Sequence, residues 1–281
     1  MNTSKIALLP LQPSSLSSIE KWGEAEGWLM DGGELNRILA RFPHLAIGAY
    51  EGDRCVGAIM GYMHEKTVWL CNFIVAAQRR GQGIGRRIFE CALETIAHEK
   101  ATQKLFAEDQ AVPFYERCGF KADGIAGRFV LGCAPCAAPI LTPFDRAPLS
   151  RDYGLPLRYS AAAFGEDRAL FLCKDMIYPD SQLLVSENGV LHMRTIGGYV
   201  FVGVFLASAY ANAELLLRTA IGVRSKLPIM IVTPIENHDA VSLLKRYGFE
   251  QQGATICMSR GEKVRENCAM IYGYATAASH A

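Results

Sequence analysis

The sequence has almost no net charge, and this absence narrows the classes of partner that the protein could bind. Its 281 residues carry 29 lysines and arginines against 28 aspartates and glutamates, a formal net charge of +1 at pH 7. Proteins that bind nucleic acids or membrane surfaces through bulk electrostatics need a strong basic excess. We therefore expect no nucleic-acid partner and no membrane partner, and any anionic ligand must be bound by a local cluster of charges.

Motifs for structural zinc and for the common nucleotide cofactors are also missing. The nine cysteines include one C-x-x-C pair, Cys133 and Cys136, which lies in a proline-rich stretch without a second pair. The P-loop pattern does not occur, and the dinucleotide pattern G-x-G-x-x-G fails because Arg86 stands at its third glycine. We expect no metal site, no P-loop and no dinucleotide site.

Targeting signals are weak in this chain. Its first residues lack the charged and then apolar order of a signal peptide, and most cysteines lie in apolar runs, as buried reduced thiols do. Residues 195–213 carry no charge and approach the ~20 residues of a membrane-spanning helix. Their several glycines and Asn212 favour a buried strand that runs into a helix. We expect a cytoplasmic protein.

What the chain does contain is a repeated α/β pattern. Hydrophobic residues make up 50% of the sequence, which predicts a packed globule, and its length favours two domains. Residues 114–120 (FYERCGF) have a counterpart in residues 243–249 (LLKRYGF), and each follows an apolar helix and a short strand. Four prolines between residues 135 and 148 mark a linker. We predict one unit over residues 1–137 and a second over residues 138–281.

The first unit reads as alternating strands and helices. Capping-box spacing at residues 17–20 and 31–34 predicts two helices that end before Pro43. Apolar runs separated by turn residues predict strands, and a four-residue apolar period from Ile84 to Ile96 predicts a helix. The predicted strands cover residues 6–9, 45–50, 55–63, 67–75 and 104–107, and a short helix follows at residues 112–118.

Residues 79–87 (RRGQGIGRR) are the most informative segment. They follow an apolar strand and open a helix, and their three alternating glycines let successive backbone N–H groups point at one spot. Four arginines flank the glycines, although cations oppose the dipole at a helix start. An anion that neutralises them would explain this choice, and the phosphates of coenzyme A would suffice. The alternative is a solvated, arginine-rich helix start whose glycines serve close packing.

This segment resembles the signature R-x-x-G-x-G of the GNAT superfamily of N-acetyltransferases. The family's second motif has a match as well, and weaker similarity over the full length resembles bacterial acetyltransferases with a degenerate second GNAT-like domain. The matching residues are Arg80, Gly83 and Gly85 for the first motif and Ala111, Phe114, Tyr115, Gly119 and Phe120 for the second.

The resemblance implies an α/β fold of two GNAT-like units in tandem, each a mixed, mostly antiparallel sheet flanked by helices. It also implies acetyl-CoA as co-substrate, with a backbone strand along the pantetheine arm, a glycine cradle at the pyrophosphate, and Tyr115 as the acid that protonates the departing thiolate. The implied binding residues are Phe73, Ile74, Val75, Arg80, Gly81, Gln82, Gly83, Ile84, Gly85 and Arg86. Glu108 stands where the family often has an asparagine, so this sequence lacks the side chain that usually makes that contact.

Chemical roles can also be argued from residue types. Acyl transfer to an amine needs a neutral amine, a stabilised oxyanion and a proton for the thiolate. Tyr115 carries a proton at neutral pH and suits the acid role, and its alternative role is core packing beside Phe114. Glu108 is the candidate base, although surface acids are usually only solvated. We expect His64 to be solvated in a hairpin turn.

These residues lead to three hypotheses. The first is an N-acetyltransferase that acts on a primary amine of a small molecule or peptide. The second is an acyl-CoA sensor or pseudo-enzyme that keeps the cradle, and the third is a structural partner that forms a homodimer through the apolar second half. Because Leu244 replaces Tyr115 in the second unit, and residues 207–214 lack glycine and arginine, we expect that unit to bind no coenzyme A.

Overall fold

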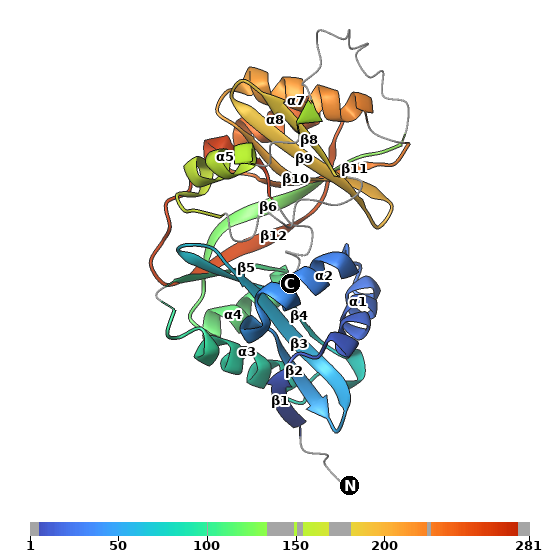
Figure 1. The fold of residues 1–281 in the computed structure, drawn as a ribbon, viewed down its shortest axis with the longest axis vertical. Coiled ribbons are helices and arrows are strands. Elements are labelled where there is room, and N and C mark those ends of the chain that lie inside the picture. Colours follow the sequence, from blue (N-terminus) through green and yellow to red (C-terminus); the bar gives the residue numbers. More distant parts are fainter. Residues whose placement is uncertain are drawn as a thin grey trace.

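A computed structural model describes residues 6–99, 101–133, 149–150, 154–168, 181–223 and 226–274, with only the backbone given for 149–150 and 154–157. The described chain folds into two α/β halves that share one 13-stranded sheet. The halves lie at opposite ends of the molecule, and two long strands run side by side between them (Figure 1). The mixed, largely antiparallel sheet flanked by helices confirms the predicted fold class.

The first half follows the predicted order of elements. Its strands are β1 (Ile6–Pro10), β2 (Ile47–Glu51), β3 (Arg54–Met63), β4 (Thr67–Val75), β5 (Thr102–Ala107) and β6 (Lys121–Leu131). Its helices are α1 (Leu16–Ala25), α2 (Gly32–Arg41), α3 (Ile84–Thr95) and α4 (Val112–Arg117). In Figure 1, α1 and α2 lie on one side of these strands and α3 and α4 on the other.

The second half is built from a similar series of strands and helices. Its strands are β7 (Leu149–Ser150), β8 (Gln182–Ser186), β9 (Gly189–Ile196), β10 (Tyr199–Ala207), β11 (Ile229–Pro234), β12 (Glu250–Arg260) and β13 (Ile271–Gly273). Its helices are α5 (Gly154–Phe164), α7 (Tyr210–Val223) and α8 (His238–Arg246). α5 packs on the larger hydrophobic core, whereas α7 and α8 pack on a second core, so they cover opposite faces.

The two halves exchange their long strands. The sheet order is β1-β2-β3-β4-β5-β12-β6-β11-β10-β9-β8-β7, so β12 of the second half pairs with β5 of the first, and β6 pairs with β11. β6 and β12 also pair with each other in the centre. The division at residue 137 stays a prediction about the sequence, because in space each unit is completed by a strand of the other.

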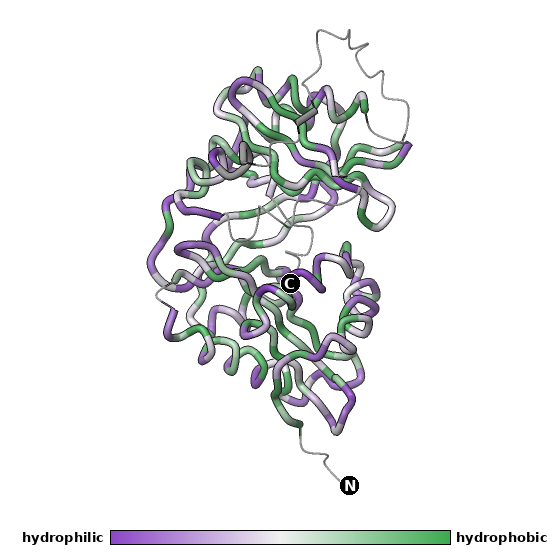
Figure 2. The backbone as a smooth tube through the Cα atoms, viewed as in Figure 1, coloured by the Kyte–Doolittle hydropathy of each residue, from purple (hydrophilic) through white to green (hydrophobic). Residues whose placement is uncertain are grey.

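Alternation of side chains along β6 lets the strand serve both cores. Ala126 and Val130 pack into the larger core, which holds most of the first half, whereas Phe129 and Leu131 pack into the core beneath α7 and α8. Successive residues of a strand point to opposite faces, so one strand can bury both sets. Figure 2 shows hydrophobic residues concentrated in the strands of both halves. The shared strand therefore joins the halves through burial as well as hydrogen bonds.

Local capping explains where the second helix begins but not the first. The Asp31 side chain accepts hydrogen bonds from the amides of Gly33 and Glu34, as its spacing predicts. α1, in contrast, begins at Leu16, and Ser15 stands at its N-cap without a side-chain cap. The capping box predicted at Ser17 is therefore wrong, because a short 3-10 turn begun by Pro13 starts the helix earlier.

Residues 195–213 form the end of β9, a glycine turn, the buried strand β10 and the start of α7, which confirms the strand-to-helix prediction. No helix in the described part of the chain is long and apolar enough to cross a membrane. β10 lies between β9 and β11 in the sheet, so its apolar residues are buried within this chain. These residues suggested a homodimer because they need burial, and the neighbouring strands of the same chain provide it.

His64 is buried rather than solvated, which corrects the sequence prediction. It is 2% exposed and its Nε2 accepts a hydrogen bond of 2.9 Å from Nε of Arg168, contributed by the second half. Burial and the Arg168 charge hold the pKa of His64 well below its usual value. The hairpin turn looked exposed because sequence alone does not show which distant segment covers it. Cys136 and the proline-rich linker lie outside the described residues.

Candidate active site

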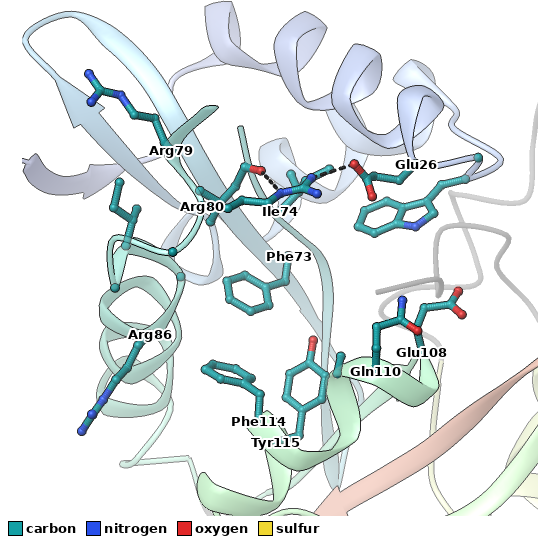
Figure 3. A pocket seen from close by; sticks show the side chains of 18 of the residues that line it. Glu26, Phe73, Ile74, Arg79, Arg80, Arg86, Glu108, Gln110, Phe114 and Tyr115 are labelled. Atoms are coloured by element: carbon teal, nitrogen blue, oxygen red, sulfur yellow. Dashed lines mark hydrogen bonds and ion pairs between the residues drawn. The ribbon is translucent and has the colours of Figure 1, made fainter. Parts of the chain in front are cut away.

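A cavity of about 770 Å³ opens between β4, β5 and the helices α3 and α4 (Figure 3). Its wall combines the glycine segment, aromatic side chains and charged residues from both the first half and the shared strand β6. The lining residues are Glu26, Gly27, Trp28, Phe73, Ile74, Val75, Arg79, Arg80, Gly81, Gly83, Ile84, Gly85, Arg86, Glu108, Gln110, Ala111, Phe114, Tyr115 and Arg128.

The cavity exists because β4 and β5 separate. These parallel strands pair only from Thr67 to Trp69, opposite Thr102 to Lys104. Beyond that point β4 carries a register shift against β3, and Asn72 adopts a φ of 50°, which is uncommon for a residue other than glycine. Such an irregularity bends a strand away from its neighbour. The backbone of Phe73, Ile74 and Val75 therefore faces the cavity instead of β5.

The glycine segment shapes the other wall. Gly81 and Gly83 have φ values of 73° and 74°, conformations that side chains rarely adopt, and open space surrounds both. Arg87 is the first residue of α3 whose amide bonds to a described carbonyl, that of Gly83 at 3.2 Å. The amides of residues 81–86 have no backbone acceptor among the described residues, as expected at a helix N-terminus. This geometry fits an anionic group such as a pyrophosphate.

Gly85 serves a different purpose from the other two glycines. A Cβ atom at this position would lie 3.3 Å from the ring of Phe73 and 3.5 Å from Val75. The absence of a side chain therefore lets the first turn of α3 approach the strand that lines the cavity. Close packing therefore explains Gly85, whereas Gly81 and Gly83 leave the space that the predicted cradle needs.

The arginines of the segment have protein partners. Arg80 donates to the Val75 carbonyl at 3.0 Å and pairs with Glu26 at 2.7 Å, which links the cradle to the loop between α1 and α2. The remaining pairs are Arg79 with Glu51, Arg86 with Glu90, and Arg87 with the carbonyl of Ile6. Three of the four charges are thus neutralised within the protein, so the backbone geometry is the stronger reason to expect an anion here.

Tyr115 stands in the middle of the cavity wall. It is 2% exposed, and its ring packs against those of Phe89 and Phe114, each with centroids 5.3 Å away. Figure 3 shows its hydroxyl pointing into the cavity, between Phe73 and Gln110. Burial raises the pKa of Tyr115 above its ordinary value, so the hydroxyl keeps its proton at neutral pH. The residue packs with its ring and presents a proton donor at its tip.

The cysteines near the cavity are poor nucleophiles. Burial raises the pKa of Cys71 and, with the nearby Glu90 carboxylate, that of Cys118. Since the thiolate is the reactive form, both thiols are unreactive at neutral pH. Among the described residues, no group of histidines, cysteines and carboxylates could hold a metal ion.

Glu108 follows the last residue of β5 and precedes the short 3-10 turn at Asp109–Ala111. It is half-buried, lines the cavity, and lies beside Gln110 in Figure 3. The adjacent Asp109 is exposed and does not line the cavity. Of the two acids that the sequence offered, the structure thus brings Glu108 to the site.

The structure brings nearly all of the predicted residues together. Tyr115, Glu108 and nine of the ten predicted cofactor-binding residues line the cavity, and the exception is Gln82, whose side chain donates to the Gln78 carbonyl at 3.4 Å. Sequence reasoning assigned no role at the site to Trp28, Gln110 or Arg128. No local signal points to Arg128, because its strand reaches the cavity only through the strand exchange.

The second half contacts the rim of the cavity. Arg194 of β9 pairs with Asp31 at 2.6 Å and with Glu34 at 2.5 Å, at the start of α2. A methyl group on Gly197, in the turn after β9, would overlap Leu29. Both contacts fall on the loop of residues 26–31, which supplies Glu26, Gly27 and Trp28 to the cavity. The second half therefore supports one wall of the site.

The corresponding place in the second half is built differently. Leu244 is buried where Tyr115 stands in the first, and Glu214 near the start of α7 accepts a hydrogen bond of 2.7 Å from Tyr247. Glu214 also pairs with Arg246 at 3.1 Å. A carboxylate at this helix start repels an anion, whereas the glycine segment of the first half favours one.

Two family models match the sequence. The first, described as the acetyltransferase (GNAT) family, covers residues 11–120, and the second, described as an acetyltransferase (GNAT) domain, covers residues 157–273. No curated protein matches the chain.

Solved structures of similar fold span nearly the whole chain. A protein from Pyrococcus horikoshii assigned as an acetyltransferase has 20% identity and a TM-score of 0.82, with 99% of this chain and 97% of that one covered. A GCN5-related N-acetyltransferase from Sphaerobacter thermophilus has 14% identity and a TM-score of 0.66, covering 98% of each chain. One from Kribbella flavida has 17% identity and a TM-score of 0.59, covering 91% and 72%. At such identities the likeness concerns the fold.

Proposed function

Because this chain belongs to the GNAT family of acetyltransferases and carries two of its domains in tandem, we propose that it transfers an acetyl group from acetyl-CoA to a primary amine. The family supports acyl transfer in general. The acetyl donor, the amine acceptor and the assignment of the reaction to the first domain are parts of this proposal.

One observation carries the proposal: the glycine cradle and the Tyr115 hydroxyl face the same cavity. A protein that only bound coenzyme A would need the cradle but not a proton donor beyond it. Acyl transfer from a thioester requires both, because the departing sulfur must be protonated. The second half offers neither feature, since Leu244 and Glu214 occupy the equivalent positions.

In this proposal, different residues of the cavity bind different parts of acetyl-CoA. The amides of residues 81–86 hold the pyrophosphate of coenzyme A, and Arg80 stays beside it through its bonds to Val75 and Glu26. The backbone of Phe73, Ile74 and Val75 on the side of β4 that faces the cavity lies along the pantetheine arm. Acetyl-CoA supplies the activated acyl group when bound, and the strand amides orient its carbonyl.

Proton transfers fall to two side chains. Tyr115 gives its proton to the leaving sulfur, and the burial that raises its own pKa also favours the neutral form of a thiol placed beside it. Glu108, at the end of β5, takes a proton from the acceptor ammonium so that a neutral amine can attack. Gln110 and Trp28, the latter on the loop of residues 26–31, line the same cavity.

The direct test is a titration of the full-length protein with acetyl-CoA by calorimetry, followed by a screen of amines for free-thiol release. We expect saturable binding and thiol release that depends on an amine. Binding without turnover on amines, amino acids or N-terminal peptides would favour the sensor alternative. Absence of binding would reject the cradle assignment.

We also propose that the protein works in the cytoplasm. Of the seven cysteines described as free, Cys55, Cys71 and Cys257 are buried. Reduced, buried thiols are typical of a reducing compartment. The apolar strand of the second half gives no reason to propose a homodimer, because that strand is buried within one chain.

A further inference from the structure

Four arginines line the cavity, and three of them are paired with glutamates: Arg79 with Glu51, Arg80 with Glu26, and Arg86 with Glu90. The fourth, Arg128, makes no ion pair with any residue that the structure describes. Its Nε and Nη2 donate to the backbone carbonyl of Gln252 at 3.2 and 2.8 Å. A half-buried guanidinium with only a carbonyl partner stands out against the other three.

The sheet places Arg128 at the end of the cavity opposite the glycine cradle. β12 is antiparallel to both β5 and β6, so β6 runs parallel to β5 at a distance of two strand spacings, about 10 Å. Ala107 is in register with Ile256, and Ile256 with Ile125. Arg128 therefore stands beyond the carboxyl end of β5, on the side of Glu108 and Gln110, whereas the cradle follows β4.

A distortion of β12 holds the arginine in place. The pairing of β12 with β6 shifts register between Gln251 and Ala254, and Gly253 has a φ of 130°. This bulge turns the carbonyl of Gln252 out of the ladder and toward the guanidinium. A Cβ atom at position 253 would lie 3.1 Å from Nη2 of Arg128. The second half thus contributes a glycine and a carbonyl that orient one side chain of the first.

The donors that remain on Arg128 suit a carboxylate. A guanidinium carries five N–H donors in a planar fork, and the Gln252 carbonyl uses only one edge of it. Planar oxyanions bind such a fork with two parallel hydrogen bonds. A phosphate dianion is less suited, because Glu108 lines the cavity on the same side and would repel it.

Building on the proposed acetyl transfer, we infer that the acceptor is a primary amine that also carries a carboxylate. Its carboxylate binds Arg128 on β6, and its ammonium group lies near Glu108 at the end of β5. Opposite charges at the two ends of the acceptor side set the orientation of the substrate, so the amine is directed toward the acyl group. Arg128 is a specificity-determining residue in this arrangement, and it takes no part in the proton transfers.

Matched amines test this inference. We would compare 4-aminobutyrate with butylamine, 6-aminohexanoate with hexylamine, and phosphoethanolamine with ethanolamine, measuring thiol release from acetyl-CoA. The wild-type protein should use the carboxylated amines with a kcat/KM about 10- to 100-fold above that of the amines without a carboxylate. A pair of charge-assisted hydrogen bonds supplies a difference of this size. In Arg128→Gln the preference should vanish because the KM for the carboxylated amines rises, while the kinetic constants for the amines without a carboxylate stay unchanged.

Controls separate the charge from the fold. Arg128→Lys should keep part of the preference, and Gly253→Ala should weaken it by displacing the guanidinium. Arg246→Gln, which removes an exposed arginine in the second half, should leave it intact. If Arg128→Gln does not fold, as judged by its thermal transition, the lysine and Gly253→Ala variants still decide the result.

The outcomes also separate this inference from the proposed function. Equal use of amines with and without a carboxylate, or a preference for phosphoethanolamine, would overturn the inference while leaving acetyl transfer in place. If no amine is acetylated, the proposed function fails. Calorimetry with the coenzyme A-loaded protein can still measure whether a carboxylated amine binds at Arg128. Binding of 6-aminohexanoate to the wild type but not to Arg128→Gln would support the carboxylate site, and equal binding or none would reject it.

Discussion

At the scale of single residues, Tyr115 combines two properties that usually exclude each other. Its ring belongs to a buried aromatic cluster with Phe73, Phe89, Phe114 and Phe120, yet its hydroxyl reaches the cavity. Phenylalanine preserves the ring and removes only the proton donor. This position therefore allows catalysis to be tested without disturbing the core.

We predict that Tyr115→Phe lowers kcat by about 100-fold, as the loss of a proton-transfer group does, with little change in the affinity for acetyl-CoA. Because burial raises its pKa above the ordinary value, Tyr115 stays protonated as the pH rises, and activity should not fall from its ionisation below pH ~10. Steady-state kinetics and calorimetry would measure both effects. Tyr247→Phe, in the corresponding region of the second half, is the matched control. A fully active Tyr115→Phe variant would leave this tyrosine a packing residue.

Glu108 can be tested against its neighbour. If its carboxylate takes the proton of the acceptor ammonium, Glu108→Gln should lower the rate and flatten the rising limb of the pH–rate profile, because the amine loses its general base. Asp109→Asn removes the adjacent exposed acid and should leave the profile unchanged. Profiles measured from pH 5 to 9 for the three proteins would show this. An unaltered profile for Glu108→Gln would mean that the amine loses its proton elsewhere.

At the scale of elements, the contact between β9 and α2 connects the second half to the cavity. Arg194 and Glu34 have side chains that are each 5% exposed, and Asp31, which caps α2, shares the same guanidinium. Burial raises the pKa of Glu34 even though Arg194 opposes the shift. Removing one member of such a pair leaves an uncompensated buried charge, which costs far more than an exposed pair contributes.

We predict that Arg194→Met lowers the free energy of unfolding by about 3–5 kcal/mol at pH 8 and raises the KM for the acceptor, because the loop of residues 26–31 loses its support. The double variant Arg194→Met/Glu34→Gln should recover most of the stability. Because folding raises the pKa of the Glu34 carboxyl, the folded state binds its proton more tightly than the unfolded state does. The free energy of unfolding therefore falls as the pH rises through the folded pKa. Without Arg194 this pKa rises further, and the loss should be smaller at pH 5 than at pH 8. A loss below ~0.5 kcal/mol, as exposed residues give, would contradict this account.

At the scale of the whole molecule, the exchange of β6 and β12 makes the two halves interdependent. A fragment that ends at residue 137 would lose β12, which pairs with Gln103 to Ala107 of β5. It would also leave β6 without either of its neighbours. Unpaired strands with apolar faces promote aggregation.

We predict that residues 1–137 alone are poorly soluble or lose acceptor turnover, and that co-expression with residues 138–281 restores both. The full-length protein should bind one coenzyme A per chain, because the second half has neither the glycine cradle nor the tyrosine. Soluble yield, thiol release and calorimetric stoichiometry would be measured for each form. Full activity of the first fragment would refute the interdependence, and two equivalent sites per chain would refute the prediction of a single coenzyme A site.

Local sequence was sufficient for the elements and for one wall of the site. The glycine segment could be identified because the strand, the turn and the helix start lie within residues 67–87, where backbone preferences act over a few positions. Tyr115 follows from a contiguous motif in the same way, and Glu108 was chosen because it ends the predicted strand just before that motif. His64 was misjudged because its burial depends on Arg168, which lies 104 residues away in the chain.

The sequence by itself therefore determined two α/β units of one pattern, with a glycine-rich helix start in the first and none in the second. Only the tertiary structure decided that the units exchange strands, because β-strand pairing is nonlocal and either partner satisfies the same backbone hydrogen bonds. That exchange brings Arg128 and the Gln252 carbonyl together across 124 residues and lets Arg128 line the cavity. Residue types set the chemistry that each position can perform, and long-range packing set which of those positions meet.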